Sequence, residues 1–152
     1  MLFFDFHLII AIGINKMKKI LNLVLSFGLT GMLVACSNVK NPENVAQEYV
    51  TAAYKGDSEK MLSYIYIPEN VKAQAGSEEM IQGKIKAGAA KAKEQAERKG
   101  GVKEISVVDK NIDEANGKGR VTIGVSFKNE GSNSVTDRVK LIKNEDKWKV
   151  DL

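Results

Sequence analysis

The chain has 152 residues, enough for one domain with appendages, and its 43% apolar and 28% charged residues are typical of a globular protein rather than a disordered one. The net charge of +4 overstates how basic the domain is, because three lysines precede Cys36. From Cys36 onward, 20 Lys and Arg residues oppose 18 Asp and Glu residues. This balance argues against a nucleic-acid-binding protein, which would carry a stronger and clustered positive excess.

Cysteine and histidine are each used once. A single cysteine, Cys36, excludes an intramolecular disulfide. The single histidine, His7, precedes it, so the part from Cys36 onward has no imidazole for general base catalysis, a Ser-His arrangement or a zinc site. We therefore assign no catalytic residue, no metal site and no cofactor.

A signal sequence is predicted between Met17 and Cys36. Two lysines follow Met17, and residues 20–35 form an apolar stretch of 16 residues. This is the order of a secretory signal, and the stretch is shorter than the roughly 20 residues that a membrane-spanning helix needs. Residues 1–16 either add a first apolar segment or precede the true start at Met17. We favour the second, because a signal that begins at Met17 is complete without them.

The end of this stretch, Leu33-Val34-Ala35-Cys36, resembles the lipobox of bacterial lipoproteins. In that class the cysteine thiol receives a diacylglyceryl group and the signal is cut just before it. The resemblance implies lipidation of Cys36 and an anchor in the outer or cytoplasmic membrane, with the domain outside the cytoplasm. The alternative is an uncleaved anchor whose cysteine is incidental. We therefore divide the chain into a signal region (1–35), a lipidated tether (36–40) and a domain (41–152).

Two helices are predicted at the start of the domain. Asn41 is a suitable N-cap, Pro42 suits the first helical position, and Gly56 suits the C-terminal end. Asp57 caps the next helix, which Pro68 stops.

A third, longer helix is predicted from Ser77, taken as its N-cap, to the Gly100-Gly101 pair. It is rich in lysine. We expect a solvated face, with a second hypothesis that the basic side chains contact the membrane or a partner; the candidates are Lys84, Lys91 and Arg98.

After Gly101 the apolar residues alternate with period 2, which predicts strands. Asn116-Gly117 marks a turn, and the final strand is expected to place Trp148, Val150 and Leu152 on one face. Helices followed by about four strands predict an α+β domain with the helices packed on a curved antiparallel sheet.

Two segments carry a family resemblance: NPENVAQEYVTAAYKGDSEKM (41–61) and VKLIKNEDKWKVDL (139–152). They resemble bacterial lipoproteins of domain-of-unknown-function family 4878, which is placed in the nuclear transport factor 2-like, cystatin-like superfamily. The resemblance implies a cone-shaped fold, with helices in the concavity of a bent sheet, and an envelope location. The family has no established activity, so it supplies no catalytic residue.

Aromatic residues are the candidates for a ligand pocket in this fold. Tyr49, Tyr64 and Trp148 have the apolar bodies and polar tips that suit a pocket, but packing in the helix–sheet interface is favoured over that role.

The sequence thus favours a lipid-anchored envelope protein that acts as a non-catalytic binding or interaction module, for an envelope protein or a small ligand. One alternative is an enzyme with an Asp-, Glu- or Tyr-lined pocket in the cone interior, which the lack of histidine makes less favoured. Another is a structural subunit of an envelope complex.

Overall fold

The computed structural model describes residues 41–129, 131 and 133–152. All the described residues belong to one unit of the chain, Ser37–Leu152. The predictions for the signal region, the Met17 start, the lipidation of Cys36 and the tether 36–40 lie outside the described residues.

The first helix begins and ends at the predicted residues, and the second begins at its predicted cap. Helix α2 spans Pro42–Lys55, and the Asn41 side chain accepts hydrogen bonds from the backbone N–H groups of residues 43 and 44 at 2.9 and 3.3 Å. Gly56 ends it with a φ of 77°, a conformation that glycine adopts without steric cost. Helix α3 spans Ser58–Tyr64, and the Asp57 carboxylate accepts from the backbone N–H of Lys60 at 2.9 Å.

Helix α3 ends four residues before Pro68, where the sequence placed its stop. Ile65 forms a parallel bridge with Val150, and the backbone N–H of Tyr66 donates to the Val150 carbonyl at 2.9 Å. Pairing with the last strand therefore removes these residues from the helix. A short helix, α4 (Glu69–Lys72), follows Pro68 and was not predicted.

Helix α5 spans Ser77–Arg98, but the prediction of Ser77 as its N-cap is wrong. Gly76 occupies that position with a φ of 80°, no side chain caps the helix, and Ser77 is buried as its first residue. The predicted glycine stop is confirmed: the backbone N–H of Gly101 donates to the Ala96 carbonyl at 2.8 Å, and Gly100 and Gly101 both have positive φ.

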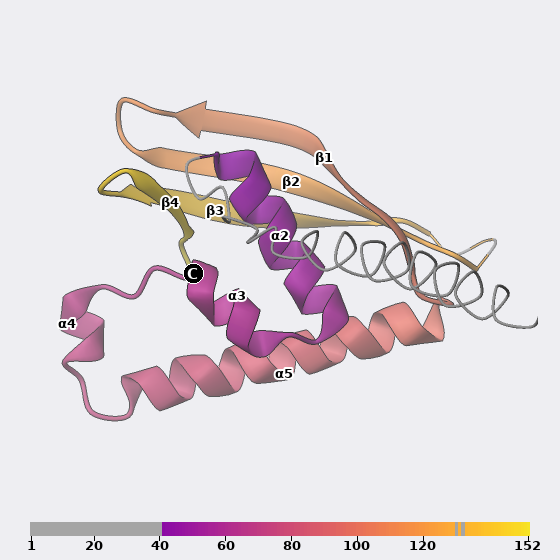
Figure 1. The fold of residues 1–152 in the computed structure, drawn as a ribbon, viewed down its shortest axis with the longest axis horizontal. Coiled ribbons are helices and arrows are strands. Elements are labelled where there is room, and N and C mark those ends of the chain that lie inside the picture. The colour runs from indigo at the N-terminus through magenta and orange to yellow at the C-terminus, as the bar shows by residue number, and fades with distance from the viewer. Residues whose placement is uncertain (1–40, 130, 132) are drawn as a thin grey trace, which may run out of the picture. The chain divides into compact units, whose positions relative to one another are not determined.

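Four antiparallel strands follow in the order β1-β2-β3-β4. In Figure 1 the helices lie together on one side of this sheet, which confirms the predicted α+β class. The last strand ends at Val150, so Leu152, expected inside, is instead 63% exposed. The strand bounds are Val102–Asp113 (β1), Lys118–Phe127 (β2), Val135–Asn144 (β3) and Lys147–Val150 (β4).

The two faces of the sheet differ in side-chain chemistry, since the inner face is mostly apolar and the outer face mostly polar. The inner face, which the helices cover, buries alternate residues of β2 together with Leu141, Trp148 and Val150. Trp148 is only 1% exposed and is the largest fully buried side chain. The outer face carries the intervening polar residues. No helix among the described residues is both long and apolar enough to cross a membrane. The alternate buried residues of β2 are Val121, Ile123, Val125 and Phe127.

Candidate functional site

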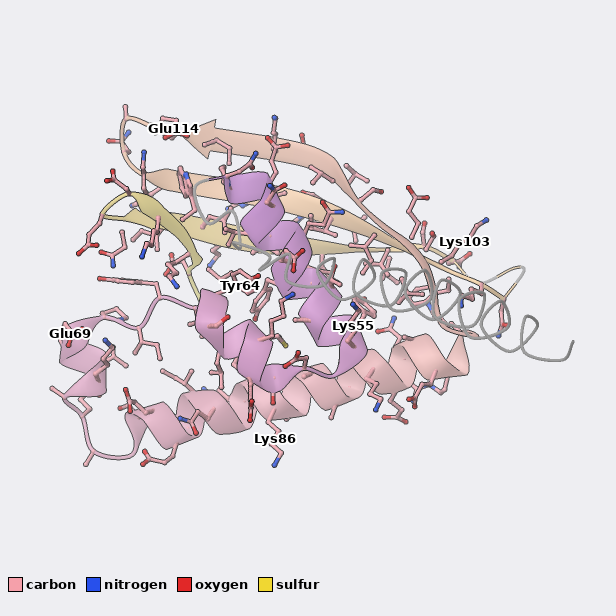
Figure 2. All side chains as sticks on the ribbon, in the orientation of Figure 1. Lys55, Tyr64, Glu69, Lys86, Lys103 and Glu114 are labelled. Carbon is pink, nitrogen blue, oxygen red and sulfur yellow. The ribbon has the colours of Figure 1, made fainter. Side chains whose placement is uncertain are left out.

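The aromatic candidates belong mainly to the core. Trp148 is 1% and Tyr64 4% exposed, and Tyr49 is half-buried against the same cluster. Figure 2 shows Tyr64 between α3 and the rest of the domain. Burial is the main cause that raises the pKa of Tyr64, with Glu48 as a second. None of the three hollows described below is lined by these three side chains.

A polar cluster on the inner face was not predicted. Asp137 lies on β3 opposite Ile123 of β2, on the face that the helices cover, and it is half-buried. Burial raises the pKa of Asp137 above its ordinary value of 3.8, while the hydroxyl of Tyr54 lowers it in part. The negative charge of Asp137 in turn adds to burial in raising the pKa of both Tyr49 and Tyr54. Two tyrosines of α2 therefore flank one carboxylate.

Tyr54 links this cluster to the end of the sheet. Its ring packs against Phe127 with the centroids 6.0 Å apart and the planes tilted by 59°. The ammonium group of Lys99 lies 4.4 Å from the centre of the Phe127 ring, a cation–π distance. It also donates to the Asn133 carbonyl at 3.3 Å.

A groove of about 530 Å³ lies between α2, α5 and the start of β1. Tyr54 lines it, so the groove reaches the edge of the polar cluster. The Gln47 side chain lines it as well and donates to the Ile105 carbonyl at 2.9 Å, which ties α2 to β1. Both polar and apolar residues line the groove; besides Tyr54 and Gln47 they are Thr51, Lys55, Lys93, Ala96, Glu97, Gly101, Val102, Lys103, Glu104 and Ile105.

The basic candidates of the third helix are exposed on α5. Lys84 and Lys91 lie on its solvent side, and Arg98 forms an ion pair with Glu94 one turn earlier. In Figure 2 the neighbouring Lys86 points away from the rest of the domain. Such an i, i+4 pair on an exposed surface contributes little to stability.

The strands carry a second basic surface, the outer sheet face, which we define as the outward residues of β2, β3 and β4. No acidic residue occupies an outward position within the bounds of these strands. Arg120 lies directly opposite Lys140, and Ile142 opposite Lys149. Its outward cations are Lys118, Arg120, Arg138, Lys140, Lys147 and Lys149, of which Lys149 donates to the Ser63 carbonyl of α3 at 2.8 Å.

A hollow of about 370 Å³ opens on this face at the end next to the β1–β2 turn. Three cations line it, Lys118, Arg120 and Lys140, together with Asp113 and Asp151. Asp113 is already engaged: its carboxylate accepts from the backbone and side-chain nitrogens of Asn116 at 3.0 and 2.7 Å, which lowers its pKa.

No group of three or more His, Cys, Asp or Glu side chains within residues 41–152, as far as they are described, could hold a metal ion.

Asp137 and the outer sheet face are the features that sequence reasoning missed. The alternation of Lys and Arg with apolar residues in β2 and β3 was the available signal for the second. For Asp137 the signal was its place in the alternation with Val135, Val139 and Leu141, which assigns it to the inward face of β3.

The comparisons with known proteins agree with this architecture. A crystal structure from Campylobacter jejuni, of a protein provisionally named an NTF2-like transpeptidase, is 30% identical, with 72% of this chain and 96% of that chain covered and a TM-score of 0.65. A SEC-C motif-containing protein from Rhodopseudomonas palustris is 14% identical over 75% of this chain and 77% of that one; its TM-score of 0.47 is too low to support an inference.

No curated protein shows significant similarity to the chain. The family model for the domain of unknown function DUF4878 matches residues 34–151, which include both segments that carried the resemblance. The fold of the described residues and the Campylobacter jejuni structure are both nuclear transport factor 2-like. The chain therefore belongs to the DUF4878 family.

Proposed function

We propose that this chain is a lipid-anchored protein of the bacterial cell envelope whose nuclear transport factor 2-like domain is a non-catalytic binding module. The anchor is supported by the sequence that precedes the domain. A Leu-Val-Ala-Cys lipobox ends at Cys36, and the first helix is capped by Asn41 only five residues later. A lipid on Cys36 would therefore hold the domain at the membrane surface.

The filled interior is the observation that most favours binding over catalysis. Trp148, Ile123 and Leu141 occupy the centre of the inner face with exposures of 1%, 0% and 2%. Beside this packed interior lies the groove between α2, α5 and β1, which is lined by both polar and apolar residues. Such a groove suits a peptide or another elongated ligand better than a reaction that must exclude water.

The Campylobacter jejuni relative raises transpeptidation as a specific activity. Such a reaction needs a nucleophile that is activated by a base to accept the acyl group. Among the described residues, the hydroxyls of Thr51 and Ser63 donate to backbone carbonyls, and no serine or threonine is hydrogen-bonded to a basic side chain. These residues therefore favour binding over acyl transfer.

Asp137 supports a second candidate, an acid–base enzyme. A half-buried carboxyl with a raised pKa, flanked by Tyr49 and Tyr54, has the character of a general acid or base. The Asp137→Asn substitution separates the two functions. A binding module keeps its ligand with asparagine at this position, whereas an acid–base enzyme loses turnover by about 100-fold or more.

The anchor is tested by the mass of the N-terminal peptide of the protein isolated from membranes. We expect Cys36 at the N-terminus with a diacylglyceryl thioether, and loss of the lipid in Cys36→Ala. A free thiol with residues 20–35 still attached would overturn the proposal.

The binding role is tested by a photo-crosslinking residue at Thr51 in the groove, in cells, with Glu59 on the solvent side of α3 as the matched control position. We expect a discrete adduct from position 51 only. Equal labelling from both positions would contradict a role for the groove.

A further inference from the structure

We propose that the outer sheet face binds the anionic headgroups of the membrane that carries the anchor, with a lipid phosphate seated in the hollow beside Lys118, Arg120 and Lys140. This inference rests on the proposed lipid anchor and adds a second contact between the domain and the bilayer. It assigns the contact to residues on strands, not to the lysines of α5.

The charge pattern of this face is the first support. Arg120 and Lys140 lie directly opposite each other on β2 and β3, and like charges in that position destabilise a sheet. None of the ion pairs among the described residues includes either of them. A bound anion would turn this repulsion into two attractive contacts, since arginine presents a fork of donors that matches a phosphate group.

The hollow keeps a positive excess despite its two carboxylates. Asp113 accepts two hydrogen bonds from Asn116 and lies directly opposite Lys118 on the neighbouring strand. Asp151 is exposed, and its backbone N–H donates to the Lys140 carbonyl at 3.0 Å. Three cations against two carboxylates leave the hollow positive, and the strands beyond it add Arg138 and Lys147. An extended anionic surface therefore fits this face better than one small ion does.

The start of α2 lies at the same end of the sheet as the hollow. Asn41 and Glu43 line a small hollow together with residues at the end of β1, which are Lys110, Ile112 and Glu114. The neighbouring residues Asn111 and Asp113 line the hollow on the outer face. In Figure 1, α2 begins beside the β1–β2 turn. Four residues separate Cys36 from Asn41, and the five residue-to-residue steps reach at most about 18 Å, which exceeds the roughly 10 Å thickness of a sheet layer. The anchor can therefore be attached while the outer face lies on the lipid.

The basic face of α5 lies at the other end of α2. That helix has 14 residues, about 21 Å of rise, and its last turn meets α5 where Gly56 packs against Lys93. The diameter of α5 adds about 10 Å more. The outer side of α5 is thus farther from Asn41 than the tether can reach, and Figure 2 shows Lys86 pointing away from the Glu114 end. We infer that α5 faces away from the membrane.

A lysine-labelling experiment on the lipidated protein tests this orientation. The protein purified from membranes is reconstituted into vesicles of phosphatidylcholine, with or without phosphatidylglycerol, and labelled with an amine-reactive reagent. We expect Lys118 and Lys140 to be protected severalfold on anionic vesicles and released by high salt, with Lys84 and Lys91 labelled equally on both. Protection of Lys84 and Lys91 in place of Lys118 and Lys140 would overturn the inference.

The unlipidated fragment 37–152, which contains the whole described core, isolates the sheet contact from the anchor. We expect it to sediment with anionic but not neutral vesicles, and the double variant R120E/K140E to lose at least about tenfold in partitioning. The control K84E/K91E changes the charge equally on α5 and should bind as the wild type does. Equal losses in both variants would overturn the inference.

Two further outcomes separate the possible explanations. If the fragment binds inorganic phosphate in the hollow but does not bind anionic vesicles, the hollow is a site for a free anion, and the lipid assignment is overturned. Unmodified Cys36 in the membrane-derived protein would overturn the anchor alone, since vesicle binding by the fragment would still support the sheet contact.

Discussion

Arg120 on β2 and Lys140 on β3 face each other directly across the outer side of the sheet. Elsewhere the same domain joins its elements with opposite charges, as Glu43 and Lys110 do between α2 and β1 and Glu114 and Lys143 do at the strand ends. A directly opposed like-charged pair costs stability, so this pair is better explained by a ligand than by the fold.

Substituting Lys140 by Glu should therefore stabilise the fold while weakening lipid binding. The change replaces a repulsive cross-strand pair by one of opposite charges, worth roughly 0.2–1 kcal/mol in the free energy of unfolding. Urea denaturation of fragment 37–152 at low salt measures it, and the gain should shrink at high salt because the pair is exposed. Lys86→Glu on the solvent side of α5 is the control and should change stability by less. A loss of stability in Lys140→Glu would contradict our interpretation of the pair.

Gly119 marks a close approach between the first two strands and the tryptophan. A Cβ added there would lie 2.8 Å from Cδ1 of Ile112 and 3.5 Å from the Trp148 ring. We expect Gly119→Ala to destabilise the domain by about 1–3 kcal/mol through overpacking.

Ile112→Val removes the clashing Cδ1 atom and should relieve part of that cost. The double variant is then less destabilised than the sum of the two single changes, by at least about 0.5 kcal/mol in a double-mutant cycle. Strict additivity would show that Ile112 moves aside freely and that the approach is not tight.

Trp148 closes the inner face, and its replacement tests how far the core depends on it. With 1% of the side chain exposed, Trp148→Ala should cost about 3–5 kcal/mol. Leu152→Ala is the matched control from the same end of the chain, since Leu152 is 63% exposed and should contribute little. Similar losses from both variants, measured by thermal unfolding, would contradict the observed end of β4 at Val150.

Local signals in the sequence predicted most of the fold. Asn41, Gly56 and Asp57 act through neighbouring backbone groups, so their roles could be predicted from a few adjacent residues. The end of α3 and the exposure of Leu152 could not be predicted in this way. Both depend on where the last strand pairs, and that pairing joins Ile65 to Val150 from distant parts of the sequence.

The candidate sites were harder to predict for the same reason. Alternation in β2 assigns Arg120 to the outer face, but only the register with β3 places Lys140 opposite it. Asp137 occupies an inward position of β3, and its proximity to Tyr54 depends on how α2 crosses the sheet. Sequence spacing carries no information on either relationship.

The titration of Asp137 should reduce stability as the pH rises. Burial raises the pKa of this carboxyl above 3.8, so the folded protein binds the proton more tightly than the unfolded chain does. The resulting stabilisation is complete below about pH 3.8, the unfolded value, and is lost as the pH rises through the raised folded value. Asp137→Asn, which stays neutral, should therefore be more stable than the wild type at neutral pH, with the difference shrinking in acid.

Tyr54→Phe supplies the matching control, because the Tyr54 hydroxyl is the group that lowers the pKa of Asp137. Its removal should raise that pKa further, which NMR titration of the Asp137 carboxyl carbon measures directly. The same titration in Tyr64→Phe should be unchanged, since Tyr64 interacts with Glu48 instead. If Asp137 titrates at or below 3.8 in the wild type, its carboxylate is stabilised by a partner and the acid–base role proposed as the second candidate loses its basis.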